Sequence, residues 1–198
     1  MSKQHGSRGL RVIAGSARGR RLVAPVGEQV RPTKDIARES MFSALDARGA
    51  LSDATVLDLY AGTGALAIEA LSRGAAAAVL VERDRAALDA IRANLQVLPG
   101  EDAVAAPIDV VARDVSRFLA AGPPPDAPFD LVFVDPPYDT ADEEITELLA
   151  TLLRPGWLAR EAIVSVERPR RHPVVVPAGL SNRWERSFGD TLLTFLHP

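Results

Sequence analysis

The stretch from residue 55 to residue 73 most limits the possible folds, because an aliphatic run passes through two glycines into a helical pattern. Residues 55–60 predict a strand and residues 65–73 predict a helix, with Gly62 and Gly64 in the turn between them. A strand that turns directly into a helix usually begins a unit in which the next strand runs parallel to the first. The stretch therefore favours a parallel sheet covered by helices.

The same alternation continues along most of the chain. The further strands are expected at 76–82, 104–111, 129–135 and 162–167, and the further helices at 85–97, 116–120 and 143–153. These strands lack regular polar alternation, which is expected when helices cover both faces of a sheet.

The C-terminal segment breaks the alternation. Residues 183–188 and 191–196 predict two strands that are joined only by Gly189 and Asp190, which leaves no room for a crossover helix. They must pair as an antiparallel hairpin. The predicted fold class is therefore α/β: a Rossmann-like, doubly wound, mostly parallel seven-stranded sheet with a C-terminal antiparallel hairpin.

The N-terminal segment predicts a small separate structure. Residues 10–14 and 20–24 favour two short strands, and the turn residues at 15–19 would join them into a β-hairpin. Pro32 and Thr33 favour a helix start with Thr33 as the N-cap, and Gly49 would end this helix. The expected buried face of the helix consists of Ile36, Ala37, Met41, Ala44 and Leu45.

Charge is distributed unevenly along the chain. Residues 1–38 hold nine Lys and Arg against two acidic residues, a net charge of +7, and the remainder has a net charge of −10. This asymmetry predicts a basic arm (1–38) that contacts nucleic acid and an acidic domain (39–198), although a solvated tail that aids solubility would have the same composition. The predicted RNA contacts are Arg11, Arg18, Arg20, Arg21, Arg31 and Lys34.

Several other classes of protein are disfavoured. The chain has no cysteine, its three histidines are scattered, and no spacing suggests a metal site. No apolar run approaches the roughly 20 residues that span a bilayer, and the N-terminus lacks the apolar region of a secretory signal. We therefore predict a cytoplasmic protein without metal or membrane, and a monomer.

The turn at Gly62 and Gly64 predicts a cofactor site. Glycines there let a ligand approach the backbone, and the following helix offers free N–H groups. Glu82 ends the second strand and can accept hydrogen bonds from ribose hydroxyls. NAD and S-adenosylmethionine both fit this pattern, and a tight turn without a ligand is the structural alternative.

Further residues refine the cofactor prediction. Asp58 precedes Gly62 by four residues, and a carboxylate at that place suits the ammonium group of S-adenosylmethionine. Asp114 follows the third strand, where it could contact the adenine amine or simply cap the helix that begins at Ser116. The neighbouring Ala61, Arg83 and Val115 are expected to contact the same cofactor.

The segment Asp135-Pro136-Pro137-Tyr138 predicts the reaction. Asp135 and the carbonyl of Pro136 are two acceptors that can hold the two N–H groups of an exocyclic amine. Tyr138 offers a ring on which the base can stack after it leaves its own stack. A proline turn that closes the strand is the alternative, and a hydride-transferring enzyme has no use for these residues.

The motifs together resemble the ribosomal small-subunit methyltransferase D family of class I S-adenosylmethionine-dependent methyltransferases. The resemblance covers nearly the whole chain in colinear order, and it includes the segments at 11–15, 18–22, 31–35, 38–42, 58–64 and 135–138. It implies methylation of guanine N2 in 16S rRNA, at guanine 966, within the small ribosomal subunit. It also implies that Asp135, Pro136 and Tyr138 carry the chemistry, and that Arg38 lies near the carboxylate of the cofactor.

Three other functions share some of these features. A DNA adenine-N6 methyltransferase uses the same acceptor motif, but this chain leaves little room for a DNA-reading domain. A glutamine-amide methyltransferase would be expected to have Asn at position 135, where this chain has Asp. A non-catalytic ribosome assembly factor would not need the intact motifs at 58–64 and 135–138.

Overall fold

The computed structural model describes residues 9–25, 32–99 and 106–198, without the side chains of residues 32–35. Its helices are α1 (Pro32–Asp46), α2 (Ala65–Ser72), α3 (Arg85–Leu95), α4 (Val115–Ala120) and α5 (Asp142–Leu152). Its strands are β1 (Thr55–Leu59), β2 (Ala77–Glu82), β3 (Ile108–Ala112), β4 (Phe129–Val134), β5 (Leu158–Pro169), β6 (Ser181–Phe188) and β7 (Thr191–His197).

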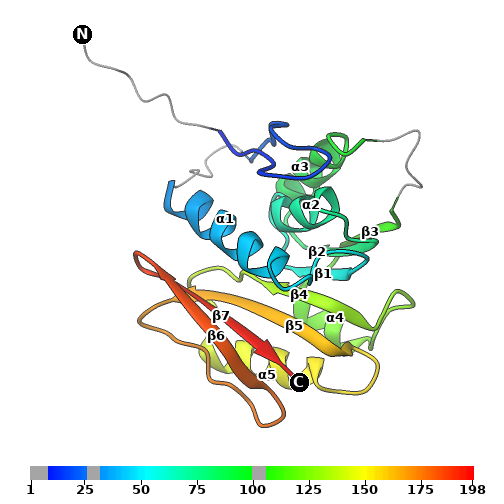
Figure 1. The fold of residues 1–198 in the computed structure, drawn as a ribbon. Helices are drawn as coiled ribbons and strands as arrows, with labels where there is room; N and C mark the ends of the chain where they lie inside the picture. Colours follow the sequence, from blue (N-terminus) through cyan, green and yellow to red (C-terminus); the bar gives the residue numbers. More distant parts are fainter. Residues whose placement is uncertain (1–8, 26–31, 100–105) are drawn as a thin grey trace.

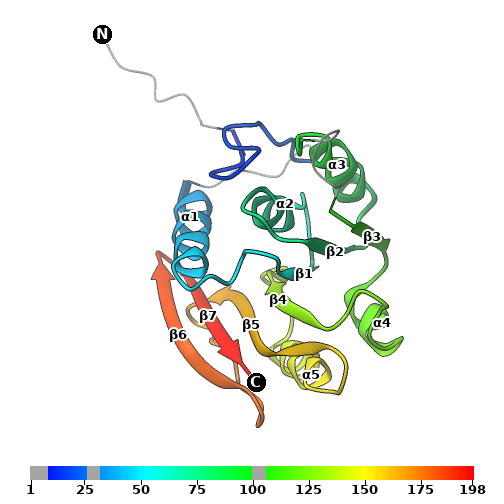
Figure 2. The same cartoon turned by 45° about the vertical axis from the view of Figure 1, so that its right-hand side comes forward.

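The strands form one sheet of seven in the order β3-β2-β1-β4-β5-β7-β6. The pairs from β3 to β5 are parallel, whereas β7 runs antiparallel to both β5 and β6. The helices α1, α2 and α3 cover one face and α4 and α5 cover the other (Figures 1 and 2). The order turns around between β1 and β4, so ligands are expected at the carboxyl ends of these two strands.

Buried side chains alternate between the two faces of the sheet. Leu131 and Phe133 pack under α1 and α2, while Val132 and Val134 pack against α4 and α5. Both faces are apolar, which explains why the strand sequences show no polar alternation. The predicted fold class and the C-terminal hairpin are therefore both present.

The N-terminal arm (residues 9–25) forms a hairpin without regular strands. The two predicted strands are reduced to one bridge between Arg11 and Arg21. Hydrogen bonds from Val12 N to Arg20 O and from Leu22 N to Leu10 O hold the two sides together. The prediction of regular strands was wrong because other backbone N–H groups of the arm bond to side chains of α2 instead.

Two details of α1 differ from the prediction. The helix begins at Pro32, the first-turn position that proline favours, so Thr33 lies inside it and is not its N-cap. The predicted buried face is confirmed for Ala37, Met41, Ala44 and Leu45, but Ile36 is 58% exposed. Consecutive helical residues are rotated by about 100°, which turns Ile36 away from the sheet. The basic arm predicted from charge was expected to end at residue 38, but this residue lies inside α1.

Candidate active site

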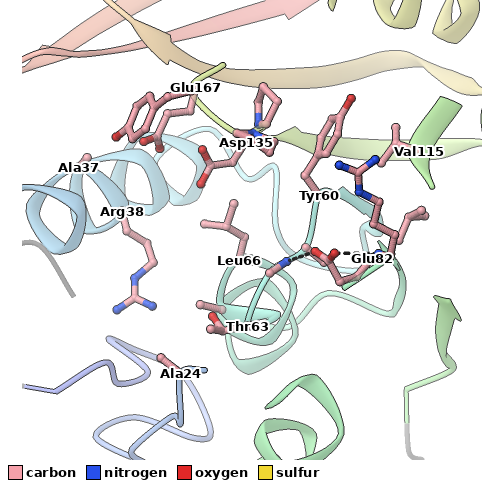
Figure 3. Close-up of a pocket in the computed structure, with 18 of the residues that line it drawn as sticks. Ala24, Ala37, Arg38, Tyr60, Thr63, Leu66, Glu82, Val115, Asp135 and Glu167 are labelled. Carbon is pink, nitrogen blue, oxygen red and sulfur yellow. Dashed lines mark hydrogen bonds between the residues drawn. The ribbon is translucent and has the colours of Figure 1, made fainter. Parts of the chain in front are cut away.

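A pocket of about 700 Å³ opens at the carboxyl ends of β1, β2, β4 and β5. Residues of α1 and of the N-terminal arm border its other side (Figure 3). The predicted site residues that line it are Arg38, Ala61, Gly62, Glu82, Arg83, Asp114, Val115, Asp135, Pro136 and Tyr138. The fold thus brings the glycine turn and the Asp-Pro-Pro-Tyr segment, which are about 70 residues apart in the chain, into one cavity.

The glycine turn has a backbone that other residues rarely adopt. Gly62 and Gly64 have φ values of +54° and +73°. A Cβ on Gly64 would approach Leu80 Cδ2 to 3.1 Å and Ile91 Cγ1 to 3.3 Å, so Gly64 also allows α2 and α3 to pack closely on the sheet. A Cβ on Gly62 would meet only the backbone oxygen of Tyr60, at 3.9 Å, so a side chain there would take up space in the pocket that Gly62 lines.

Asp58 lies beneath the turn and does not line the pocket. Its side chain is 1% exposed, and Oδ2 accepts a hydrogen bond of 3.1 Å from Ala67 N–H at the start of α2. Oδ1 is buried without a hydrogen-bond partner among the described residues. Burial raises the pKa of this carboxyl well above its ordinary value, and the nearby Asp135 and Glu82 add to the effect. An unpaired buried oxygen of this kind suits a ligand with a cationic group.

Glu82 is held firmly at the end of β2. One carboxylate oxygen accepts a hydrogen bond of 2.8 Å from Gly62 N–H. The other oxygen accepts from the N–H groups of Arg83, at 2.7 Å, and Asp84, at 2.8 Å. These bonds fix the carboxylate beside the glycine turn, and the oxygen that accepts only from Gly62 retains a lone pair for a ligand hydroxyl.

Asp114 caps α4, as one of the two sequence interpretations expected, and it also lines the pocket. Its Oδ1 caps α4 by accepting from the N–H of Ser116, at 3.0 Å, and from its hydroxyl, at 2.6 Å. Its Oδ2 accepts from Arg83 at 2.9 Å, and the residue also lines the pocket. The bond from the Ser116 hydroxyl and the Arg83 contact lower the pKa of this carboxyl, so Asp114 stays ionised at the rim.

The Asp-Pro-Pro-Tyr segment begins directly after β4. Asp135 is half-buried, Pro136 is buried and Tyr138 is 44% exposed at the pocket mouth. The following loop is held by Arg168 of β5, which donates to Thr140 O at 2.9 Å and to the carboxylate of Asp142. Arg168 is only 3% exposed, so this clamp adds to the stiffness that the prolines give to the segment.

Sequence reasoning missed several lining residues, among them Tyr60, Thr63 and Glu167. Tyr60 has a positive φ of +61°, and its hydroxyl donates to Glu144 at 3.1 Å. Burial raises the pKa of this phenol above its usual range. Its position between Asp58 and Gly62 could have indicated a place in the site, since residues that directly follow a core strand lie at the edge of the sheet where ligands bind.

Four of the six predicted RNA contacts lie among the described side chains, and these four do not line the pocket. Arg11, Arg18, Arg20 and Arg21 are exposed on the N-terminal arm. The side chains of Arg31 and Lys34 lie outside the described residues. Arg38 is 7% exposed, lines the pocket, and donates to Arg11 O at 2.8 Å, so it connects α1 with the arm.

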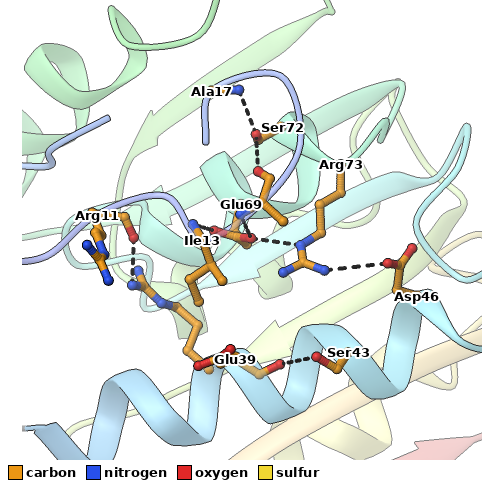
Figure 4. A network of polar contacts seen from close by, with 11 residues as sticks. Arg11, Ile13, Ala17, Glu39, Ser43, Asp46, Glu69, Ser72 and Arg73 are labelled. Carbon is orange, nitrogen blue, oxygen red and sulfur yellow. Dashed lines mark hydrogen bonds and ion pairs between the residues drawn. The ribbon is translucent and has the colours of Figure 1, made fainter. Parts of the chain in front are cut away.

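Polar side chains of α2 hold the arm in place (Figure 4). Glu69 is fully buried and accepts from Ile13 N–H at 2.6 Å, Ala14 N–H at 3.0 Å and Arg73 Nε at 2.7 Å. The hydroxyl of Ser72 accepts from Ala17 N–H at 2.9 Å and donates to Ala14 O at 2.6 Å. The arm is therefore attached to the same helix that begins at the glycine turn.

Buried Asn94 of α3 makes a second connection. Its side-chain oxygen accepts from Val23 N–H at 2.7 Å, and its amide group donates to Val23 O and to Thr63 O, both at 2.9 Å. Val23 belongs to the arm and Thr63 to the glycine turn. One side chain thus joins the two.

Among residues 9–25, 32–99 and 106–198, no helix is long and apolar enough to cross a membrane. Within the same residues, no group of three or more His, Cys, Asp or Glu side chains could hold a metal ion.

The chain is similar to known proteins along nearly its whole length. The family model described as conserved hypothetical protein 95 matches residues 10–197. The chain is 40% identical to the ribosomal RNA small subunit methyltransferase D of Escherichia coli K12 over 186 residues, 93% of this chain and 88% of the relative. It is 32% identical over 181 residues to the Haemophilus influenzae protein of the same name, covering 91% and 89%.

A solved structure supports the same assignment. The Escherichia coli protein yhhF matches with a TM-score of 0.78 and 38% identity, over 95% of this chain and 97% of that one. The predicted class I methyltransferase fold is thereby confirmed. The chain belongs to the conserved hypothetical protein 95 family, which is the family of the ribosomal RNA small subunit methyltransferase D relatives that the sequence resembles.

Proposed function

We propose that this chain transfers a methyl group from S-adenosylmethionine to the exocyclic N2 amine of a guanine in 16S rRNA of the small ribosomal subunit. The observation that carries the proposal is the placement of Asp135, Pro136 and Tyr138 in one pocket with the glycine turn and Glu82. The names of the relatives support an rRNA substrate, and the family resemblance supports guanine 966.

The residues present fit the cofactor. Glu82 would accept the ribose hydroxyls, and the backbone at Gly62 lets the ligand approach closely. The unpaired Oδ1 of Asp58 lies beneath the turn, where the ammonium group of the cofactor would favour the ionised form of this carboxyl. Asp114 would face the adenine amine, and Arg38 would face the carboxylate. When bound, S-adenosylmethionine supplies a methyl group on a positively charged sulfur.

Asp135 and Pro136 prepare the amine. The nitrogen of an exocyclic amine is a poor nucleophile because its lone pair is delocalised into the ring of the base. If the Asp135 carboxylate and the Pro136 carbonyl accept its two N–H groups, the lone pair is directed toward the pocket. Asp135 also offsets the positive charge that grows on the nitrogen, and it can accept the proton that the nitrogen then loses.

The half-exposed ring of Tyr138 would stack on the base after it leaves its own stack. The buried Pro136 and the Arg168 clamp keep the acceptors in place, so little reorganisation is needed at the transition state.

The exposed arginines of the N-terminal arm would contact RNA phosphates. Arg11, Arg18, Arg20 and Arg21 are exposed, and the arm contributes Leu10 and Ala24 to the pocket lining. An RNA bound along this arm would therefore lie beside the pocket entrance. The arm gives affinity and position, while the pocket selects the base.

The test uses methyl-labelled S-adenosylmethionine and small subunits from cells that lack the modification. Naked 16S rRNA and duplex DNA run in parallel, and the products are hydrolysed to nucleosides. Label in N2-methylguanosine from the subunits supports the proposal. Label in N6-methyladenine of the DNA would replace it with a DNA methyltransferase, and absence of label despite cofactor binding would point to an assembly role.

A further inference from the structure

Glu167 lies directly beside Asp135 at the end of the sheet. β4 and β5 are parallel, and their last paired residues are Val134 and Val166. Asp135 and Glu167 are the next residues on the two chains. Neighbouring parallel strands are about 4.8 Å apart, and residues at the same register point to the same face. The pairing thus brings two carboxylates next to each other.

Both side chains point into the pocket. Phe133 of β4 and Ile163 of β5 pack on the face covered by α1, and Asp135 and Glu167 lie on that same face two and four residues further on. Both line the pocket, and Figure 3 shows them close together above Arg38. Glu167 is half-buried, and its Oε1 atom is shielded from solvent.

The position of Glu167 is rigid. The backbone of β5 pairs with β7 at Leu193, which also lines the pocket. The next residue, Arg168, points to the opposite face and is fixed by Thr140 and Asp142. A side chain anchored on a strand that is paired on both sides holds its direction well enough to read the edge of a base.

We propose that Glu167 determines the choice of guanine by accepting a hydrogen bond from guanine N1–H while Asp135 and Pro136 hold N2. This assignment rests on the proposed function. Guanine carries N1–H next to its amine, whereas adenine carries an unprotonated N1 next to its amine. A carboxylate attracts the first edge and repels the lone pair of the second. The same side chain therefore favours guanine and rejects adenine.

The experiment removes the N1–H that Glu167 is proposed to read, and the comparison between variants separates this change from the loss of the O6 carbonyl that accompanies it. Small subunits are reconstituted with 16S rRNA that carries either guanine or 2-aminopurine at the target position. 2-Aminopurine keeps the amine at C2 but has an unprotonated N1. Methyl transfer to each is measured with the wild type, with Glu167→Gln, and with the control Glu161→Gln, which changes an exposed glutamate at the opposite end of the same strand.

We expect the wild type and the control to prefer guanine over 2-aminopurine by about 100-fold or more in kcat/KM. Glu167→Gln should reduce this ratio at least tenfold, because its amide can accept from N1–H or donate to an unprotonated N1. A ratio that is the same in wild type and Glu167→Gln would overturn the assignment, even if both rates fell, because a structural role lowers both rates together. No label on the guanine subunits with wild type would overturn the proposed function itself.

Discussion

At the scale of single residues, two aspartates of the site have different environments. Asp58 is buried beneath the glycine turn, while Asp135 is half-buried at the pocket wall. Burial raises the pKa of Asp58, and Asp135 contributes to that increase through its own charge. Asp58 therefore affects the stability of the fold, and Asp135 lines the pocket in which the proposed reaction would take place.

Replacing Asp135 with alanine should abolish most turnover and leave cofactor affinity near normal. The change removes one of the two acceptors for the amine, and the loss of one such group typically lowers the rate by about 100- to 1,000-fold. Turnover is measured by label transfer and affinity by calorimetry. Full activity of this variant would remove Asp135 from the mechanism.

Asp58→Asn should change how stability depends on pH. The raised pKa means that, above the ordinary value of 3.8, folded Asp58 keeps a proton that the unfolded chain has lost. The contribution of Asp58 to stability therefore falls as pH rises from that value through the raised pKa. The free energy of unfolding of wild type minus that of Asp58→Asn should decrease with pH, which urea denaturation from pH 4 upward measures. A constant difference would contradict the prediction.

At the scale of elements, the attachment of the arm depends on buried polar groups of α2. Glu69 accepts from two backbone N–H groups of the arm and from Arg73, and no part of its side chain is exposed. Its removal would leave the buried guanidinium of Arg73 with Asp46 as its remaining ionic partner, and two N–H groups of the arm without partners, a kind of change that costs about 3–5 kcal/mol.

Glu69→Ala should therefore destabilise the chain by about 3 kcal/mol and release the arm first. Hydrogen exchange at residues 12–17 should speed up more than exchange in β1. The control Asp89→Ala breaks an exposed ion pair with Arg92 and should change stability by less than about 1 kcal/mol. Unchanged exchange in the arm of Glu69→Ala would show that other contacts hold it.

The differences between predicted and observed elements have a common origin. Strands 55–60 and 129–135 could be predicted because their aliphatic runs and turn residues are local signals, and the structure has β1 and β4 there. The arm resembles strands locally, but its hydrogen bonds go to α2, which is far away in sequence. Glu167 could not be found, since its importance depends on its register with Asp135.

At the scale of the whole molecule, the basic N-terminal segment of the chain also borders the cavity. The chain has a net charge of −3, yet residues 1–38 carry +7 and the rest −10. The described part of the N-terminal arm carries four exposed arginines, and its residues Leu10 and Ala24 line the cavity. An overall acidic molecule can therefore attract a polyanion to one side only.

Neutralising Arg18, Arg20 and Arg21 together as glutamines should weaken RNA binding and flatten its salt dependence. Each lost phosphate contact lowers the slope of log affinity against log salt by about 0.7–0.9. The control changes three exposed arginines toward the opposite edge of the sheet, Arg154, Arg160 and Arg183. Equal slopes for the two triple variants would mean that the arm does not contact phosphates.

The Asn94 bridge has a thermodynamic consequence. Because one buried amide binds both Val23 of the arm and Thr63 of the glycine turn, a ligand that orders either segment changes the free energy of the other. Such coupling is reciprocal: the factor by which RNA alters cofactor affinity equals the factor by which the cofactor alters RNA affinity. Positive coupling would make the two ligands bind cooperatively, and methylated RNA and spent cofactor would then leave as linked events.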